Sequence, residues 1–218
     1  MPTVSDLKGP AGRLEALLDA PEGTAPVRAA VVFAHPHPQF GGTMHTKAVY
    51  QGAKGLTRIG CAVLRFNFRG VGASEGTFDL GDGEREDFKA ALDYMAARYP
   101  ETKLWAAGFS FGAWVALEEG AADDRVSVLI GIAPPVATSV SGQPYDFPNT
   151  RTSHKPKFFV QGEGDDVCPV EALWQFYGQL EEPKELVVID GADHLFEGKT
   201  QEVAEALEDL LADYQEPS

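Results

Sequence analysis

Short apolar runs alternate along this chain with longer segments that carry apolar residues at helical spacing. The runs have the length of buried strands and lie at residues 27–34, 62–66, 103–107, 126–133, 156–160 and 185–189. The longer segments cover residues 45–58, 82–98, 111–120, 170–180 and 201–214. Because neighbouring parallel strands are joined by helical crossovers, the alternation predicts a mostly parallel, twisted sheet with helices on both faces. One or two further edge strands are expected between residues 4 and 20.

The length of the chain fits one domain. It has 218 residues, of which 44% are hydrophobic, and this supports one full core rather than two. We therefore expect residues 1–218 to form a single α/β domain. No run approaches the roughly 18 apolar residues of a membrane span. Residues 1–8 also lack the basic start and apolar stretch of a signal peptide.

Charge and cysteine content limit the partners and the environment. The net charge of −15 repels nucleic acid and anionic membranes, so we expect neither as a partner. Cys61 and Cys168 are the two cysteines, and they form no C-x-x-C motif or paired framework. Two reduced thiols in a cytoplasmic protein are the expected outcome. The sequence leaves open whether the chain forms a homodimer.

Reactive side chains follow several of the predicted strands. Ser110 comes after the strand at 103–107, Asp165 and Asp166 after the strand at 156–160, and His194 after the strand at 185–189. The carboxyl ends of parallel strands meet at one edge of the sheet, and the loops there hold the working residues. These residues are therefore expected to converge, together with the loop at 35–43.

Ser110 lies in the motif Gly-Phe-Ser-Phe-Gly at a predicted corner between a strand and a helix. In such a corner the turn is so sharp that the serine sits strained at its tip with the hydroxyl exposed. The two glycines let the strand and the helix pack closely around it. The motif thus predicts a nucleophile elbow.

A serine nucleophile needs a base, a carboxylate that orients the base, and N–H donors for the oxyanion. The order Ser110, then Asp165 or Asp166, then His194 supplies the nucleophile, the carboxylate and the base. It predicts acyl transfer through an acyl-enzyme. Asp193 is too close to the base in the chain to hold the far nitrogen of its ring. Asp190 stays a weaker alternative for the acid. His154 precedes a strand and is expected at the opposite edge of the sheet.

Five motifs together resemble one known group of proteins. They are His-Pro-His-Pro-x-x-Gly-Gly-Thr at 35–43, Arg-Phe-Asn-Phe-Arg-Gly-Val-Gly-x-Ser-Glu-Gly at 65–76, the serine motif at 108–112, Gly-x-x-Asp-x-x-x-Pro at 162–169 and Gly-x-x-His-x-Phe at 191–196. Taken together, these residues are similar to the α/β-hydrolase superfamily, in particular its small, lidless bacterial serine hydrolases. The resemblance covers nearly the whole chain.

The resemblance implies a fold, an activity and specific roles. The fold would be a single-domain α/β-hydrolase without a cap domain, with a sheet of about 7–8 strands and one antiparallel edge strand. The activity would be esterase-like. By position in the motifs, Asp165 would be the acid, and the backbone N–H groups of Phe111 and His37 would form the oxyanion hole. Gln39 is the alternative donor, because the two prolines of the 35–43 loop have no N–H.

The substrate pocket is expected to be small and open. Only about twenty residues separate the strand at 126–133 from the next strand, too few for a lid domain. Phe40, Phe147 and Phe196 are candidates for lining an apolar acyl pocket with Phe111, with a place in the core as the alternative for all four. Short acyl chains are the expected substrates.

Other readings of the motifs carry less weight. His35, His37 and His45 could suggest a metal site, but no carboxylate or cysteine lies at ligand spacing, so neither a metal nor another cofactor is expected. The glycine-rich loop at 69–76 lacks the spacing and lysine of a phosphate-binding loop and reads as a structural turn. Cys168 has no base of its own and reads as a packing residue.

The sequence therefore predicts a hydrolase that cleaves small carboxylic esters. A thioesterase, an amidase or a dienelactone-type hydrolase are alternatives with the same catalytic groups. A catalytically silent module that binds a ligand or a partner on the same fold is the alternative from another class. The intact set of Ser110, His194 and an aspartate argues against the silent module.

Overall fold

The computed structural model describes residues 3–23, 25–137 and 144–215. The strands are β1 (Thr3–Val4), β2 (Lys8–Gly9), β3 (Gly12–Arg13), β4 (Ala16–Asp19), β5 (Ala30–Ala34), β6 (Ala62–Phe66), β7 (Leu104–Phe109), β8 (Val126–Ile132), β9 (Lys157–Gly162) and β10 (Lys184–Ile189). The helices are α1 (Lys47–Arg58), α2 (Asp82–Arg98), α3 (Phe111–Ala122), α4 (Pro148–Thr152), α5 (Val170–Tyr177) and α6 (Thr200–Leu211).

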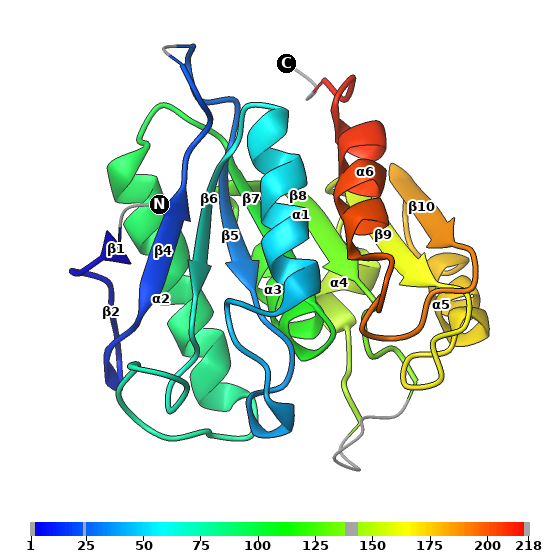
Figure 1. Cartoon of the computed structure of the whole chain (residues 1–218), viewed down its shortest axis with the longest axis horizontal. Coiled ribbons are helices and arrows are strands. Elements are labelled where there is room, and N and C mark those ends of the chain that lie inside the picture. The colour runs from blue at the N-terminus through cyan, green and yellow to red at the C-terminus, as the bar shows by residue number, and fades with distance from the viewer. Residues whose placement is uncertain (1–2, 24, 138–143, 216–218) are drawn as a thin grey trace.

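Eight of the strands form one twisted sheet in the order β1-β4-β6-β5-β7-β8-β9-β10 (Figure 1). The six strands from β6 to β10 in this order are parallel to their neighbours. β4 runs antiparallel to β6, and β1 runs antiparallel to β4. β2 and β3 form a separate two-stranded ribbon. This arrangement confirms the predicted α/β architecture.

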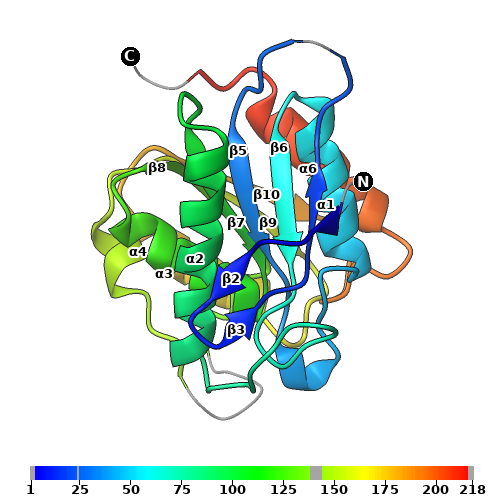
Figure 2. The same ribbon diagram turned by 90° about the vertical axis from the view of Figure 1, so that its left-hand side faces the viewer.

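Alternation along the strands divides the core between the two faces of the sheet. In β5, Val31 and Phe33 belong to the apolar cluster that includes the buried sides of α1 and α6. Val32 and Ala34 belong to the cluster that includes α2, α3 and α5. Figure 2 shows the sheet between these two helical layers. Strands buried on both faces need continuous apolar runs, and this is why they stood out in the sequence.

The amino-terminal segment differs most from expectation. Four short strands occupy the region where one or two were predicted, because residues 5–7, the turn at 10–11 and residues 14–15 separate them. A single strand, β4, does run against the others. It is not the edge strand, however, since the two-residue β1 pairs on its outer side.

In its described part, the segment between β8 and β9 holds one short helix. α4 is pinned to α3 by Glu118, whose buried carboxylate accepts hydrogen bonds from the main-chain N–H of Thr150 at 2.9 Å and from its hydroxyl at 2.7 Å. Residues 138–143, part of the stretch predicted to be too short for a lid, lie outside the described residues. Over the described ranges, no helix has the length and apolar character needed to cross a membrane.

Candidate active site

Ser110 stands at the corner between β7 and α3. Its φ of 54° and ψ of −121° lie outside the regions that a serine normally occupies, a strain of about 1–3 kcal/mol. The main-chain N–H of Ser110 donates to the carbonyl of Ile132 at 2.8 Å, which ties the corner to β8. A Cβ atom on Gly112 would come within 2.4 Å of the carbonyl oxygen of His35, and one on Gly108 within 2.1 Å of the carbonyl oxygen of Gly112. The motif therefore needs both glycines for close approach.

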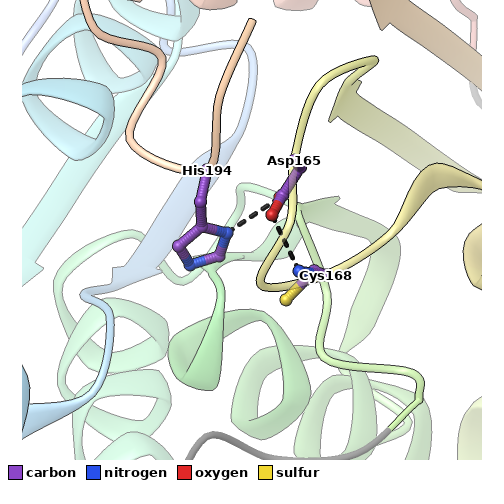
Figure 3. A group of neighbouring side chains, drawn as sticks. All are labelled: Asp165, Cys168 and His194. Carbon is purple, nitrogen blue, oxygen red and sulfur yellow. Dashed lines mark hydrogen bonds and ion pairs between the residues drawn. The ribbon is translucent and has the colours of Figure 1, made fainter.

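The structure brings Ser110, His194 and Asp165 together from three separate loops. Nε2 of His194 lies 3.0 Å from Oγ of Ser110, and Nδ1 lies 2.8 Å from Oδ2 of Asp165. Figure 3 shows the ring of His194 turned toward the carboxylate of Asp165. With Nδ1 protonated and bonded to the carboxylate, Nε2 is free to accept the hydroxyl proton. The geometry is that of a nucleophile, a base and an orienting acid.

The carboxylate of Asp165 is buried and held on both oxygens. Oδ1 accepts from the main-chain N–H of Val167 at 2.9 Å and of Cys168 at 2.7 Å. Oδ2 accepts from Nε2 of Gln161 at 2.9 Å as well as from His194. Gln161 also donates to the carbonyl of Cys168 at 2.7 Å, so its amide fixes both ends of the turn. These donors stabilise the charged carboxylate without any cation.

Gln161 was missed by the sequence analysis. It is fully buried near the end of β9, where the preceding residues are apolar. The available signal was an amide side chain in an otherwise apolar strand that leads directly into the acid loop. A buried amide needs partners, and the nearest polar groups in the chain belong to that loop.

Among the described residues, none of the other candidate acids and bases is hydrogen-bonded to His194, although Asp166 and Asp193 line the cavity over Ser110. Asp166 is exposed, and Asp165 is the residue that faces His194. Asp193 is exposed and accepts from the main-chain N–H of Glu197 at 2.9 Å. Asp190 is exposed at the end of β10, and His154 is exposed before the start of β9.

The loop after β5 is shaped by two histidines. His35 is fully buried. Its Nδ1 donates to the carbonyl of Pro36 at 2.6 Å, and its Nε2 accepts from the main-chain N–H of Phe68 at 3.1 Å. Burial lowers the pKa of His35 to about 4, and its neighbour His37 adds to this effect. His35 is thus a neutral side chain that links the backbone after β5 to the backbone after β6 through hydrogen bonds.

His37 caps the short 3₁₀ turn Pro38–Phe40. Its Nδ1 accepts from the main-chain N–H of Gln39 at 3.2 Å, and its carbonyl accepts from Gly42 at 3.1 Å. Burial lowers the pKa of His37. Among the described residues, no acceptor is bonded to the main-chain N–H of His37 or of Phe111. Both residues line the cavity over Ser110, as an oxyanion hole requires, whereas the N–H of Gln39 is engaged.

A cavity of about 420 Å³ opens over Ser110. Its lining residues are Pro36, His37, Phe40, Ser110, Phe111, Pro135, Tyr145, Asp166, Val167, Cys168, Asp193, His194 and Leu195. Phe40 is 61% exposed at its rim, and Leu195 is 56% exposed. The volume fits a small ligand.

Two of the three phenylalanines proposed for substrate binding do not reach this cavity. Phe147 is buried and packs against Phe176, with ring centres 5.0 Å apart. Phe196 is buried below the site against Phe109, at 6.1 Å. Both predictions are wrong, because each ring turns from its loop into the core. Phe40 does line the cavity, as expected.

Asp165, Cys168 and His194 also form a group whose donor atoms lie within 4.8 Å of one another. Burial and the charge of Asp165 raise the pKa of the Cys168 thiol, so it stays protonated at neutral pH. Both oxygens of Asp165 already accept two hydrogen bonds. The group therefore fits an acid–base couple better than a metal site.

Side-chain hydrogen bonds hold the glycine-rich loop at 69–76 in place. The guanidinium of Arg69 donates to the buried carboxylate of Asp87 on α2, at 3.0 Å from Nε and 2.7 Å from Nη2. The Ser74 hydroxyl donates to the carbonyl of Asn67 at 2.6 Å. These contacts tie the loop to its surroundings, as a structural turn would.

Comparisons with known proteins give one family and several close relatives. A family model described as serine aminopeptidase, S33 (Hydrolase_4) matches residues 25–150. Protein RP471 of Rickettsia prowazekii is 36% identical over 209 residues, which make up 93% of this chain and 86% of that protein.

Two solved structures are similar over nearly their whole length. An α/β serine hydrolase homologue from Coxiella burnetii superposes with a TM-score of 0.86 and 37% identity, covering 96% of this chain and 97% of that one. XC6422 from Xanthomonas campestris, described as an α/β serine hydrolase without a lid, gives a TM-score of 0.85 and 36% identity. It covers 95% of this chain and 92% of that one.

Proposed function

Because this chain belongs to the lidless α/β serine hydrolases, we propose that it cleaves small carboxylic esters with Ser110, His194 and Asp165 as its triad. The observation that carries the proposal is the continuous hydrogen-bonded path from Oγ of Ser110 through His194 to Asp165. The path opens into a mainly apolar cavity, where an acyl group can be held beside the nucleophile.

The first half of the reaction forms an acyl-enzyme. Oγ of Ser110 attacks the ester carbonyl carbon while Nε2 of His194 takes the hydroxyl proton. The carbonyl oxygen becomes an oxyanion and accepts hydrogen bonds from the main-chain N–H groups of His37 and Phe111. The carbon–oxygen bond to the alcohol then breaks, and the alcohol leaves with the proton from His194.

The second half returns the enzyme to its starting state. A water molecule gives a proton to Nε2 of His194 and attacks the acyl carbon. The bond to Ser110 breaks, Oγ takes the proton back, and the carboxylic acid leaves. Asp165 keeps the imidazole in the correct tautomer throughout and stabilises the imidazolium that forms in each half.

Short acyl chains are proposed as the preferred substrates. The cavity has a volume of about 420 Å³, and its lining includes the buried Phe111 and Cys168 as well as the exposed Phe40 and Leu195. Chains of about twelve carbons or more would extend from it into water, so they gain little from their added length.

The proposal is tested with p-nitrophenyl esters of increasing acyl length, beside an acyl thioester and an acyl p-nitroanilide. We expect a burst of p-nitrophenol equal to the enzyme concentration where deacylation is slow, and the highest kcat/KM on short esters. Hydrolysis of the thioester or the anilide at a higher kcat/KM than any ester would replace the carboxylesterase by a thioesterase or an amidase. Absence of turnover on every compound would favour a silent binding module.

A cytoplasmic location is part of the same proposal. Its support is that the chain has two cysteines, Cys61 and Cys168, and that both are buried, whereas small secreted proteins often carry many cysteines in a disulfide framework. Fractionation of the source cells with antibodies against the chain tests it. Recovery from the secreted or periplasmic fraction would contradict it.

A further inference from the structure

The cavity over Ser110 has a one-sided charge. Two carboxylates, Asp166 and Asp193, line it, and no lysine or arginine is among its described lining residues. Both aspartates are exposed, and neither forms an ion pair with any described residue. The rest of the lining is mainly apolar. Any charged substrate therefore meets uncompensated negative charge, on a protein whose net charge is already −15.

The two carboxylates belong to the same loops as the proposed triad residues His194 and Asp165. The departing alcohol takes its proton from Nε2 of His194, so it lies next to that ring. Asp193 adjoins His194 in the chain, and Asp166 adjoins the triad acid Asp165. His37 and Phe111, whose main-chain N–H groups are the proposed oxyanion donors, line the same cavity. An ester bound over Ser110 therefore lies in a cavity that both carboxylates line, whichever part of it carries a charge.

We infer that the site selects neutral or cationic esters over anionic ones, with Asp166 and Asp193 as specificity-determining residues. Substrates that carry carboxylate or phosphate groups are disfavoured by repulsion from both side chains. This rests on the proposed esterase function and narrows its alternatives. Phosphate-bearing thioesters and carboxylate-bearing lactones are poor substrates for this cavity.

The test compares three acetate esters of one phenol skeleton with the wild-type chain. The probes are 3-(trimethylammonio)phenyl acetate, its neutral isostere 3-tert-butylphenyl acetate, and 3-acetoxybenzoate. Each kcat/KM is divided by the rate of hydroxide-catalysed hydrolysis of the same ester, which removes differences in intrinsic reactivity. We expect the cationic ester to exceed the anionic one by about tenfold, and the ratio to shrink in about 0.5 M salt.

Matched variants assign the effect to the two aspartates. Asp166→Asn and Asp193→Asn should each lower the ratio of cationic to anionic rates by about threefold, the size expected for an exposed charge. Asp190→Asn is the control, because it removes the same charge from an exposed position after β10 that does not line the cavity. The ratio in Asp190→Asn should equal that of the wild type.

Three results would overturn the inference. These are equal normalised rates on the three esters, an anionic ester that is preferred, or an equal loss of preference in Asp190→Asn, which would assign it to net charge. All three leave the proposed function intact, since they require hydrolysis. Failure of the neutral ester to react with any of the proteins rejects the proposed function itself.

Discussion

His35 and His194 both follow parallel strands at the same edge of the sheet, yet their surroundings differ. His35 is fully buried, and its two nitrogens meet the carbonyl of Pro36 and the main-chain N–H of Phe68. His194 lines the cavity, and its nitrogens meet the carboxylate of Asp165 and the hydroxyl of Ser110. One ring joins two pieces of backbone, and the other joins an acid to a nucleophile.

The difference explains why we propose His194, and not His35, as the base. Protonation of Nε2 in His35 would point two N–H donors at each other in a buried site, so the ring is kept neutral and Nε2 is not available to accept a proton. Protonation of Nε2 in His194 creates a charge that Asp165 offsets directly. The identity of the partners, more than the identity of the ring, separates a structural histidine from a catalytic one.

The largest expected effect is the loss of the His194 ring. His194→Gln should lower kcat by a factor on the order of 10⁴ to 10⁶ with the fold intact, because the base is lost while few core contacts change. Steady-state kinetics and urea unfolding of the same preparation measure the two effects. If this variant keeps more than about one per cent of the wild-type activity, His194 is not the base and the contrast with His35 is wrong.

Asp165→Asn tests whether the carboxylate partner of His194 is what allows this ring to act as a base. It should cost on the order of 10⁴ in kcat, because the amide no longer holds the ring in the required tautomer. Asp166→Asn, its neighbour, should cost less than about tenfold on a neutral ester, since Asp166 does not contact the ring. If the two variants exchange these effects, the acid is misassigned by one residue. If neither matters, Asp190 becomes the candidate.

His35→Ala should lower the free energy of unfolding, and this effect on stability should be its main effect. It leaves the buried N–H of Phe68 without its partner, which costs about 1–3 kcal/mol, and it also removes the partner of the half-buried carbonyl of Pro36. The free energy of unfolding in urea should fall accordingly. A fully stable His35→Ala protein that is as inactive as His194→Gln would contradict the structural role of His35.

The two histidines should also differ in their response to pH. The pKa of His35 in the folded chain is about 4, below its unfolded value, so its neutral form stabilises the fold above about pH 6.5. That contribution is lost as the pH falls from about 6.5 toward 4, because the unfolded chain binds the proton first. Urea midpoints measured across this range should decline, and His35→Gln should weaken the decline.

Activity should follow the other ring. If neutral His194 is the base, kcat/KM should be higher at neutral pH than in acid, because a protonated ring cannot take the proton of the serine hydroxyl. The rise should appear in protein that circular dichroism shows to be folded. A rate that stays the same between acid and neutral pH would remove histidine as the base.

The sequence predicted most of what depends on local pattern. The bounds of α2 and β6 match their predicted ranges, since helical spacing and continuous apolar runs are visible without tertiary information. The elbow at Ser110 was predicted from its glycine-serine motif. Asp165 and His194 were chosen by their positions in motifs that follow predicted strands. The structure then placed these side chains within hydrogen-bond distance of each other.

What the sequence could not supply is the direction of a loop side chain. Phe147 and Phe196 stand in loops near the site, as Phe40 does, but their rings turn into the core. Gln161 holds the triad acid from within a strand, and no spacing rule marks it. The prediction that the antiparallel strand lies at the edge of the sheet was also wrong. β1, which lies outside β4, has two residues, and a strand this short shows no periodicity in the sequence.

The central claim is that Ser110 is the nucleophile, and covalent labelling tests it most directly. A fluorophosphonate probe should modify the wild-type chain once, and peptide mapping by mass spectrometry should place the label on Ser110. Cys168→Ala should still be labelled, whereas Ser110→Ala should not. Labelling that persists in Ser110→Ala, or that maps to Cys168, would contradict the account.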